Sequence, residues 1–116
     1  MTLQEREARA CAIIDNMAPE LRAISLYLHD NPELGLNEHK AVKAIHQFLE
    51  KQNFISQVGL ADMRELQTAL RADYRGNAKY KIAFLGEYDA LPELGHGCGH
   101  NLIAMINIFN IFINII

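Results

Sequence analysis

The sequence predicts an α/β fold in which helices cover a small sheet. Apolar residues recur at helical spacing in the first half of the chain, and extended apolar runs bounded by turn residues fill much of the second half. Elements in this order bury their apolar faces by packing helices against a sheet. The chain has 116 residues, 50% of them hydrophobic, which is enough for one small domain with a core and too few for two.

The first predicted helix covers residues 3–29. Residues Glu5 to Arg9 are good helix formers, and apolar residues follow them at spacings of three and four. The predicted core face consists of Met17, Leu21, Ile24 and Leu28. We expect Pro19 to break this helix, with a new first turn beginning there, because proline fits best near a helix start.

A turn and a second helix come next. The DNPE stretch at residues 30–33 predicts a turn, because the residue before a proline disfavours helix, and Gly35 adds a second breaker. Asn37 is predicted to cap a helix over about residues 38–52. The apolar face of that helix consists of Ala41, Val42, Ile45, Phe48 and Leu49.

Three extended segments follow the second helix. Residues 54–60 predict a first strand, and residues 66–74 and 79–91 predict two more. The last two segments flank the turn sequence Arg75-Gly76-Asn77-Ala78, which predicts an antiparallel hairpin. After a glycine-rich loop, a further helix is expected to begin near the end of the chain.

The loop GHGCGH, residues 95–100, carries a candidate metal site. Thiolate and neutral imidazole are favoured zinc ligands, and His96, Cys98 and His100 alternate with glycines. Alternate side chains of an extended segment point to one side, so two of them could share an ion. The alternative is a flexible loop that binds nothing. A structural zinc site needs four protein ligands, so partners would have to come from elsewhere.

One carboxylate near this loop is also a candidate. Asp89 ends an apolar extended segment, and α/β folds place ligand-binding groups at the carboxyl ends of strands. The alternative for Asp89 is a solvated strand end or a turn cap.

Charge and composition exclude several classes of function. The net charge is −3 and no basic stripe exists, so we expect no nucleic-acid partner. Cys11 and Cys98 do not form a secreted disulfide pattern, and the charged N-terminus lacks the apolar core of a signal peptide, which predicts a cytoplasmic protein. The apolar segment 102–116 is shorter than the ~20 residues that span a bilayer and contains asparagines, so no membrane partner is expected.

Three segments resemble peptidase family M-twenty, the metal-dependent amidohydrolases. They are HDNPELGLNEHKA (29–41), LRADYRGNAKYKIAFLGEYDALP (70–92) and EYDALPELGHGCGHN (87–101). The p-aminobenzoyl-glutamate hydrolase-like and dipeptidase-like subgroup is the most similar, and the likeness covers roughly residues 5–104. It implies that residues 1–104 are the N-terminal, incomplete part of a zinc-exopeptidase-like catalytic domain, with two helices and then a mixed sheet with a β-hairpin.

The same resemblance implies roles for individual residues. Cys98 and His100 correspond to metal ligands, Asp89 to a supporting group, and His96 to a recurrent position that is not a ligand. The family uses a divalent metal, zinc or manganese, with two ions in the full-length enzyme. It hydrolyses the amide bond of an N-acyl amino acid or dipeptide, p-aminobenzoyl-glutamate among them, with metal-bound water. Full-length members are homodimers.

The chain departs from the family pattern after residue 104. The general-base glutamate, the later metal ligands and the lid or dimerisation domain have no counterpart in it. Residues 105–116 use few residue types, which predicts a non-family apolar tail arising from truncation, frameshift or readthrough. The alternative is a genuine helix with a polar stripe of Asn107, Asn110 and Asn114. We therefore expect the chain alone to be inactive, and the alternative function is a non-enzymatic metal-binding or interaction fragment.

Overall fold

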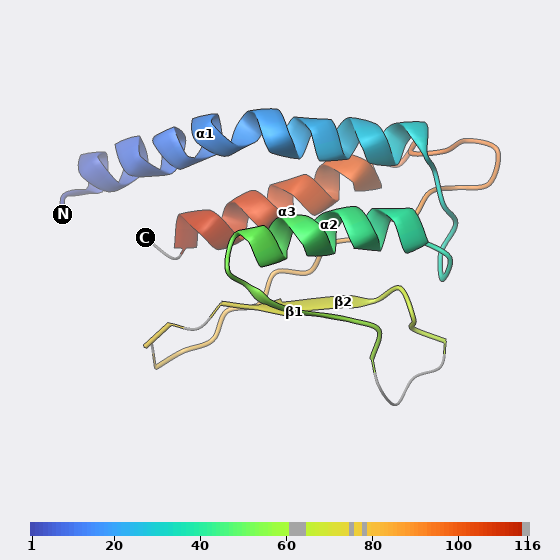
Figure 1. Cartoon of the computed structure of the whole chain (residues 1–116). Coiled ribbons are helices and arrows are strands. Elements are labelled where there is room, and N and C mark those ends of the chain that lie inside the picture. Colours follow the sequence, from blue (N-terminus) through green and yellow to red (C-terminus); the bar gives the residue numbers. More distant parts are fainter. Residues whose placement is uncertain (61–64, 75, 78, 115–116) are drawn as a thin grey trace.

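The computed structural model describes residues 1–60, 65–74, 76–77 and 79–114. Within them the chain forms helices on one side of an antiparallel strand pair (Figure 1), which confirms the predicted α/β class. The elements are α1 (Leu3–Asp30), α2 (His39–Lys51), β1 (Ile55–Val58), β2 (Leu70–Asp73) and α3 (His100–Asn114). Helix α2 packs on the strands, while α1 packs against α3 and lies farthest from the strands.

Helix α1 is continuous, so the break predicted at Pro19 is wrong. It begins with a capping box, in which the Thr2 hydroxyl accepts from the Glu5 backbone N–H and the Glu5 carboxylate accepts from the Thr2 N–H. Pro19 removes one helical donor. The apolar face nevertheless stays in phase across it, because Met17 and Leu21 are one turn apart and both contribute to the core. The predicted core face of this helix is confirmed.

Helix α2 buries the predicted face but is capped differently. Its five predicted core residues are all buried. The cap position is Glu38 rather than Asn37, and the Glu38 side chain makes no capping hydrogen bond. The buried Glu38 carboxylate accepts instead from the Thr68 hydroxyl, a partner thirty residues away that local sequence rules do not consider.

The strand pairing differs from the predicted hairpin. Strand β1 pairs with β2 in antiparallel register, with Ile55 opposite Asp73 and Val58 opposite Leu70. Residues 79–89 join no strand, so the hairpin predicted between 66–74 and 79–91 is wrong. The antiparallel hairpin is formed by β1 and β2 instead, and the described residues contain no mixed sheet.

An apolar run predicts an extended segment but does not identify its partner, which explains this error. The side chains of Tyr80, Ile82 and Leu85 are mostly exposed. Arg75 and Ala78, two of the four predicted turn residues, lie outside the described residues.

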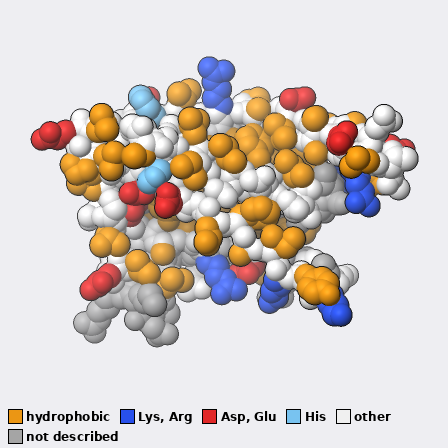
Figure 2. Space-filling model, turned by 180° about the vertical axis from the view of Figure 1, so that it is seen from behind, with side chains coloured by type: hydrophobic (Ala, Val, Ile, Leu, Met, Phe, Trp, Pro, Cys, Tyr) orange, Lys and Arg blue, Asp and Glu red, His pale blue; other side chains and the backbone are white. Residues whose placement is uncertain are grey.

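Figure 2 shows the back of the molecule, where hydrophobic side chains lie exposed among charged ones.

Helix α3 covers most of the predicted tail. Its buried residues Ala104, Met105 and Ile108 complete a core shared with α1 and α2. The Phe112 ring packs at 5.4 Å from Phe54 and at 6.3 Å from Phe48, measured between ring centroids. Residues 105–114 therefore form a packed helix, and their origin outside the family stays a prediction.

Two asparagines of the predicted polar stripe form hydrogen bonds within the helix. The Asn107 side chain donates to the carbonyl of Ile103, and the Asn114 side chain donates to the carbonyl of Asn110.

No helix in the described part of the chain is both long and apolar enough to cross a membrane.

Candidate functional site

The candidate site is centred on His100, the first residue of α3. Its Nδ1 atom lies 2.8 Å from Oδ1 of Asp89 and 3.1 Å from the Asp89 carbonyl oxygen. A carboxylate and a carbonyl only accept hydrogen bonds, so Nδ1 carries the ring proton. This contact fixes the tautomer and directs the Nε2 lone pair of neutral His100 away from Asp89. A carboxylate commonly orients a metal-binding histidine in this way.

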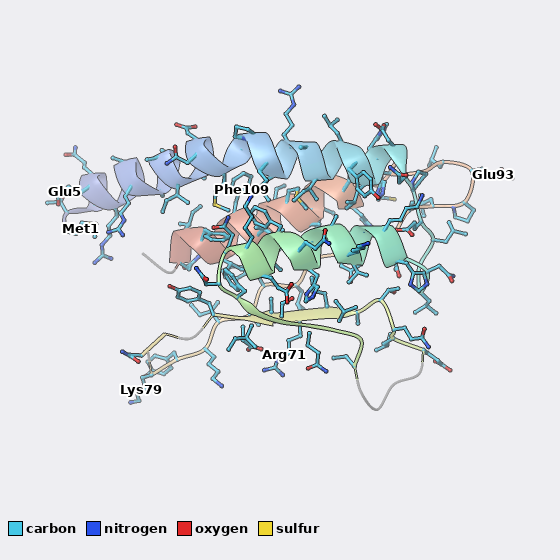
Figure 3. The ribbon with its side chains drawn as sticks, in the orientation of Figure 1. Met1, Glu5, Arg71, Lys79, Glu93 and Phe109 are labelled. Atoms are coloured by element: carbon cyan, nitrogen blue, oxygen red, sulfur yellow. The ribbon has the colours of Figure 1, made fainter. Side chains whose placement is uncertain are left out.

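The backbone on both sides of the site determines where Asp89 and His100 lie. The N–H of Ala90 donates to the carbonyl of Glu33 at 2.7 Å, and Leu34 forms a parallel bridge with Ala90. Leu91 and Gly95 then exchange two backbone hydrogen bonds and close a tight loop. This loop lies at one end of the molecule, with Glu93 at its outer edge and Met1 at the opposite end (Figure 3).

The backbone immediately before His100 favours glycine. The backbone of Gly99 has φ +76°, a left-handed conformation that residues with a Cβ rarely adopt. Its carbonyl accepts from the N–H groups of Leu102 and Ile103 and begins α3. Glycine at position 99 therefore lets the chain turn into α3 at His100 with little backbone strain.

Glu87 was missed as a site residue. Its Oε2 lies 3.1 Å from Nε2 of His100, on the ring edge opposite Asp89. Because Nδ1 already holds a proton, this second contact is a hydrogen bond only when the imidazole is protonated. The Glu87 side chain is 65% exposed, so it can move away when His100 is neutral. The family resemblance did not identify Glu87, because it assigns a supporting role only to Asp89, the aspartate of the DALP sequence.

Among the described residues, no hydrogen bond or ion pair joins the other two residues of the loop motif to this pair, although the charges of His100 and Asp89 act on His96. Cys98 is a free, exposed thiol. The Nδ1 atom of His96 is buried and has no hydrogen-bond partner among the described residues. Burial lowers the pKa of His96, and the neighbouring His29 lowers it further. His96 is therefore neutral near pH 7.

The described residues supply only part of a metal-binding shell. They contain no group of three or more histidine, cysteine, aspartate or glutamate side chains arranged to hold an ion. Cys98 and His100 are chemically suitable donors two residues apart in the chain, but a bound zinc ion takes three or four protein ligands. The donor types therefore suit part of a zinc shell and not a complete one.

A buried polar pair attaches the start of α3 to α1. The side-chain Nδ2 of Asn101 donates to the carbonyl of Ser25 at 3.2 Å and to its hydroxyl at 3.1 Å. Both residues are buried. Since Asn101 directly follows His100, this pair holds the first turn of α3 in place. The sequence contains no signal for it, because the partners are 76 positions apart.

The chain is similar to known hydrolases over most of its length, although no family model matches it. The Xaa-Arg dipeptidase of Mus musculus is 38% identical over 112 residues, which are 91% of this chain and 26% of that protein. The Xaa-Arg dipeptidase of Homo sapiens is 34% identical over 113 residues, or 90% of this chain and 26% of that protein.

An uncharacterized hydrolase of Staphylococcus haemolyticus is 35% identical over 89 residues, which are 65% of this chain and 22% of that protein. The chain thus spans about a quarter of the length of the curated relatives that it matches. These names confirm the resemblance to dipeptidase-like hydrolases that the three sequence segments indicated.

Proposed function

We propose that this chain, which is similar to Xaa-Arg dipeptidases over about nine-tenths of its length, forms one part of a metal-dependent dipeptidase or amidohydrolase of peptidase family M-twenty. The observation that carries the proposal is the contact between Asp89 and His100, with Cys98 two residues before His100. A carboxylate-oriented histidine beside a thiol is a typical half of a metal centre.

In this proposal Cys98 and His100 hold a divalent ion, zinc or manganese, and Asp89 keeps the His100 ring proton on Nδ1. The ion supplies activation of a water molecule and polarisation of the amide carbonyl when it is bound. The exposed Glu87 competes with the ion for Nε2 of His100 and moves aside on binding. The remaining ligands and the general base come from polypeptide that corresponds to the other three-quarters of the relatives.

The substrate class follows from the names of the relatives. We propose dipeptides with a C-terminal arginine as the first candidates, because both mammalian relatives are Xaa-Arg dipeptidases. An N-acyl amino acid such as p-aminobenzoyl-glutamate is the second candidate, from the motif resemblance. A cytoplasmic location and a homodimer of the complete enzyme belong to the same proposal, and Cys11 and Cys98 are both free thiols.

A chimera tests this proposal directly. In it, this chain replaces the matching quarter of the mouse Xaa-Arg dipeptidase, and hydrolysis of Xaa-Arg dipeptides and of p-aminobenzoyl-glutamate is measured. We expect Cys98→Ala and His100→Ala to lower the rate by at least about 100-fold and to lower the bound metal. Cys11→Ala is the matched control and leaves both unchanged, because Cys11 lies on α1 away from the loop. Full activity in Cys98→Ala would show that this thiol is not a ligand.

A second candidate function is a non-enzymatic interaction fragment. The exposed side chains of Tyr80, Ile82 and Leu85 on the unpaired segment 79–89 favour it, because an apolar extended segment can add to the sheet of another polypeptide. Mixing the chain with a polypeptide that carries the remaining three-quarters of the mouse relative distinguishes the two functions. Complex formation with peptidase activity supports the enzyme, and complex formation without activity supports the interaction fragment.

A further inference from the structure

We propose that Glu33 is a positioning residue that fixes the Asp89–His100 pair from the N-terminus of α2. Its importance for metal binding rests on the function proposed above, whereas its action on the geometry of Asp89 and His100 does not. Glu33 contacts both the first turn of α2 and the segment that holds Asp89.

The Glu33 side chain caps α2 from outside the helix. Its carboxylate accepts from the backbone N–H of Lys40, at 2.9 Å to Oε1 and 3.0 Å to Oε2, and from the N–H of Ala41 at 2.9 Å. These donors belong to the first turn of α2, where backbone N–H groups lack helical partners and favour a negative charge. The usual cap is missing, because the Glu38 carboxylate is bound to Thr68.

The Glu33 backbone holds the end of the unpaired segment that carries Asp89. The carbonyl of Glu33 accepts from the N–H of Ala90 at 2.7 Å, and the neighbouring Leu34 is bridged to Ala90. Ala90 is 4% exposed and directly follows Asp89. Glu33 therefore connects two parts of the fold. Its side chain binds the first turn of α2, and its carbonyl binds the backbone of Ala90.

A second pair of contacts keeps the Glu33 loop in one conformation. The Asn31 side chain donates to the carbonyl of Tyr27 at the end of α1, and its oxygen accepts from the Lys40 ammonium at 3.1 Å. The loop is thus anchored at α1 through Tyr27 and at α2 through the Glu33 carboxylate and the Asn31–Lys40 hydrogen bond. Removing the Glu33 carboxylate leaves the Asn31–Lys40 contact to hold the loop on α2, so the Glu33 carbonyl that accepts from Ala90 is held less firmly.

The direct test measures hydrogen exchange of the His100 ring proton by NMR in the metal-free chain. That proton lies between Nδ1 and the Asp89 carboxylate, so its exchange rate reports the pair itself. We expect exchange to be roughly 10-fold faster in Glu33→Ala, and faster by a smaller factor in Glu33→Gln, which keeps one acceptor oxygen for the helix.

Glu20→Ala is the matched control for the loss of a glutamate that contacts α2. Glu20 pairs with Lys51 at the other end of that helix, at 2.9 Å, and has no contact with the site. We expect its exchange rate to equal that of the unmodified chain. Far-ultraviolet circular dichroism shows whether Glu33→Ala folds. If it does not, the proposal is tested by comparing the exchange rate of the His100 ring proton in Glu33→Gln with that in the unmodified chain. An unchanged exchange rate in the folded Glu33 variants would overturn the proposal.

A second measurement separates this proposal from the proposed function. In a Cys11→Ser background, Cd²⁺ binding to Cys98 is followed by the thiolate-to-metal absorbance band. We expect Glu33→Ala to weaken the affinity roughly 10-fold, as loss of support for a ligand typically does. If Cd²⁺ does not bind the unmodified chain, the metal function fails, and the exchange rates still decide the role of Glu33. If Cd²⁺ binds equally to all variants and exchange is unchanged, the positioning role is overturned and the metal function stands.

Discussion

Replacing Asn101 with alanine tests whether the buried polar pair between α3 and α1 stabilises the fold. Asn101 is 7% exposed and its amide donates two hydrogen bonds to Ser25. Each such bond contributes a net ~0.5–1.5 kcal/mol, so Asn101→Ala should lower the free energy of unfolding by about 1–3 kcal/mol. This is a large part of the ~5–15 kcal/mol that stabilises a typical domain.

The partner residue provides a graded comparison. Ser25→Ala removes only the hydroxyl acceptor and leaves the bond to the carbonyl, so we expect a loss of about 0.5–1.5 kcal/mol. The double variant should lose less than the sum of the two single losses, because both remove the same hydroxyl–amide bond. Asn37→Ala is the matched control at an exposed position, with an expected change within about 0.5 kcal/mol.

Urea unfolding followed by circular dichroism measures these free energies through the transition midpoint and the slope. An Asn101→Ala loss as small as that of Asn37→Ala would refute the reasoning. Strict additivity of Ser25→Ala and Asn101→Ala would also refute it, because the two side chains would then act independently. A changed slope would instead indicate a change in the compactness of the denatured or native state, or a loss of two-state unfolding.

Three further predictions concern the core, a partly buried tyrosine and the first helix. Phe54→Ala should cost about 3–5 kcal/mol in urea unfolding, because Phe54 is 5% exposed and packs against Phe112, whereas Phe54→Leu should cost less than about 1.5 kcal/mol. Burial, with a smaller effect of a nearby carboxylate, raises the pKa of Tyr88 to about 12 from 10.0. The unfolded chain then loses this proton first, so stability should fall between pH 10 and about 12, and Tyr88→Phe should abolish that part of the pH dependence. The backbone and then the side chain of Thr2 lower the pKa of Glu5, and NMR titration of Thr2→Ala should show that pKa rising only part of the way back. An unchanged Glu5 pKa would show that the Thr2 hydroxyl has no influence on it.

Periodicity was sufficient for features that lie within one element. The apolar residues of α1 and α2 are predicted from spacing, because the residues that face the core are neighbours on the surface of a single helix. The end of α1, near residue 30, was also predicted, because a residue before proline disfavours helix. Pro19 shows the limit, since the packing of Met17 and Leu21 on both sides of it keeps α1 continuous.

The motif identified candidate site residues but not their arrangement. Asp89, Cys98 and His100 are named by the sequence, yet only the structure brings Asp89 to Nδ1 of His100 and Glu87 to Nε2. The cap of α2 and the partner of Asn101 were not predicted either. Their partners lie elsewhere along the chain, and propensity rules describe only neighbouring residues.

By itself, the sequence determined the helices with their core faces, the extended segments and the donor types of the loop, because these depend on local spacing and on side-chain chemistry. Only the tertiary structure decided which strands pair, that Glu33 caps α2, and that Ser25 and Asp89 flank the start of α3. The physical reason is that these contacts join residues far apart in the chain. They form only when burial of the shared core brings the elements together. The residue pattern of one element does not specify which other element it will contact.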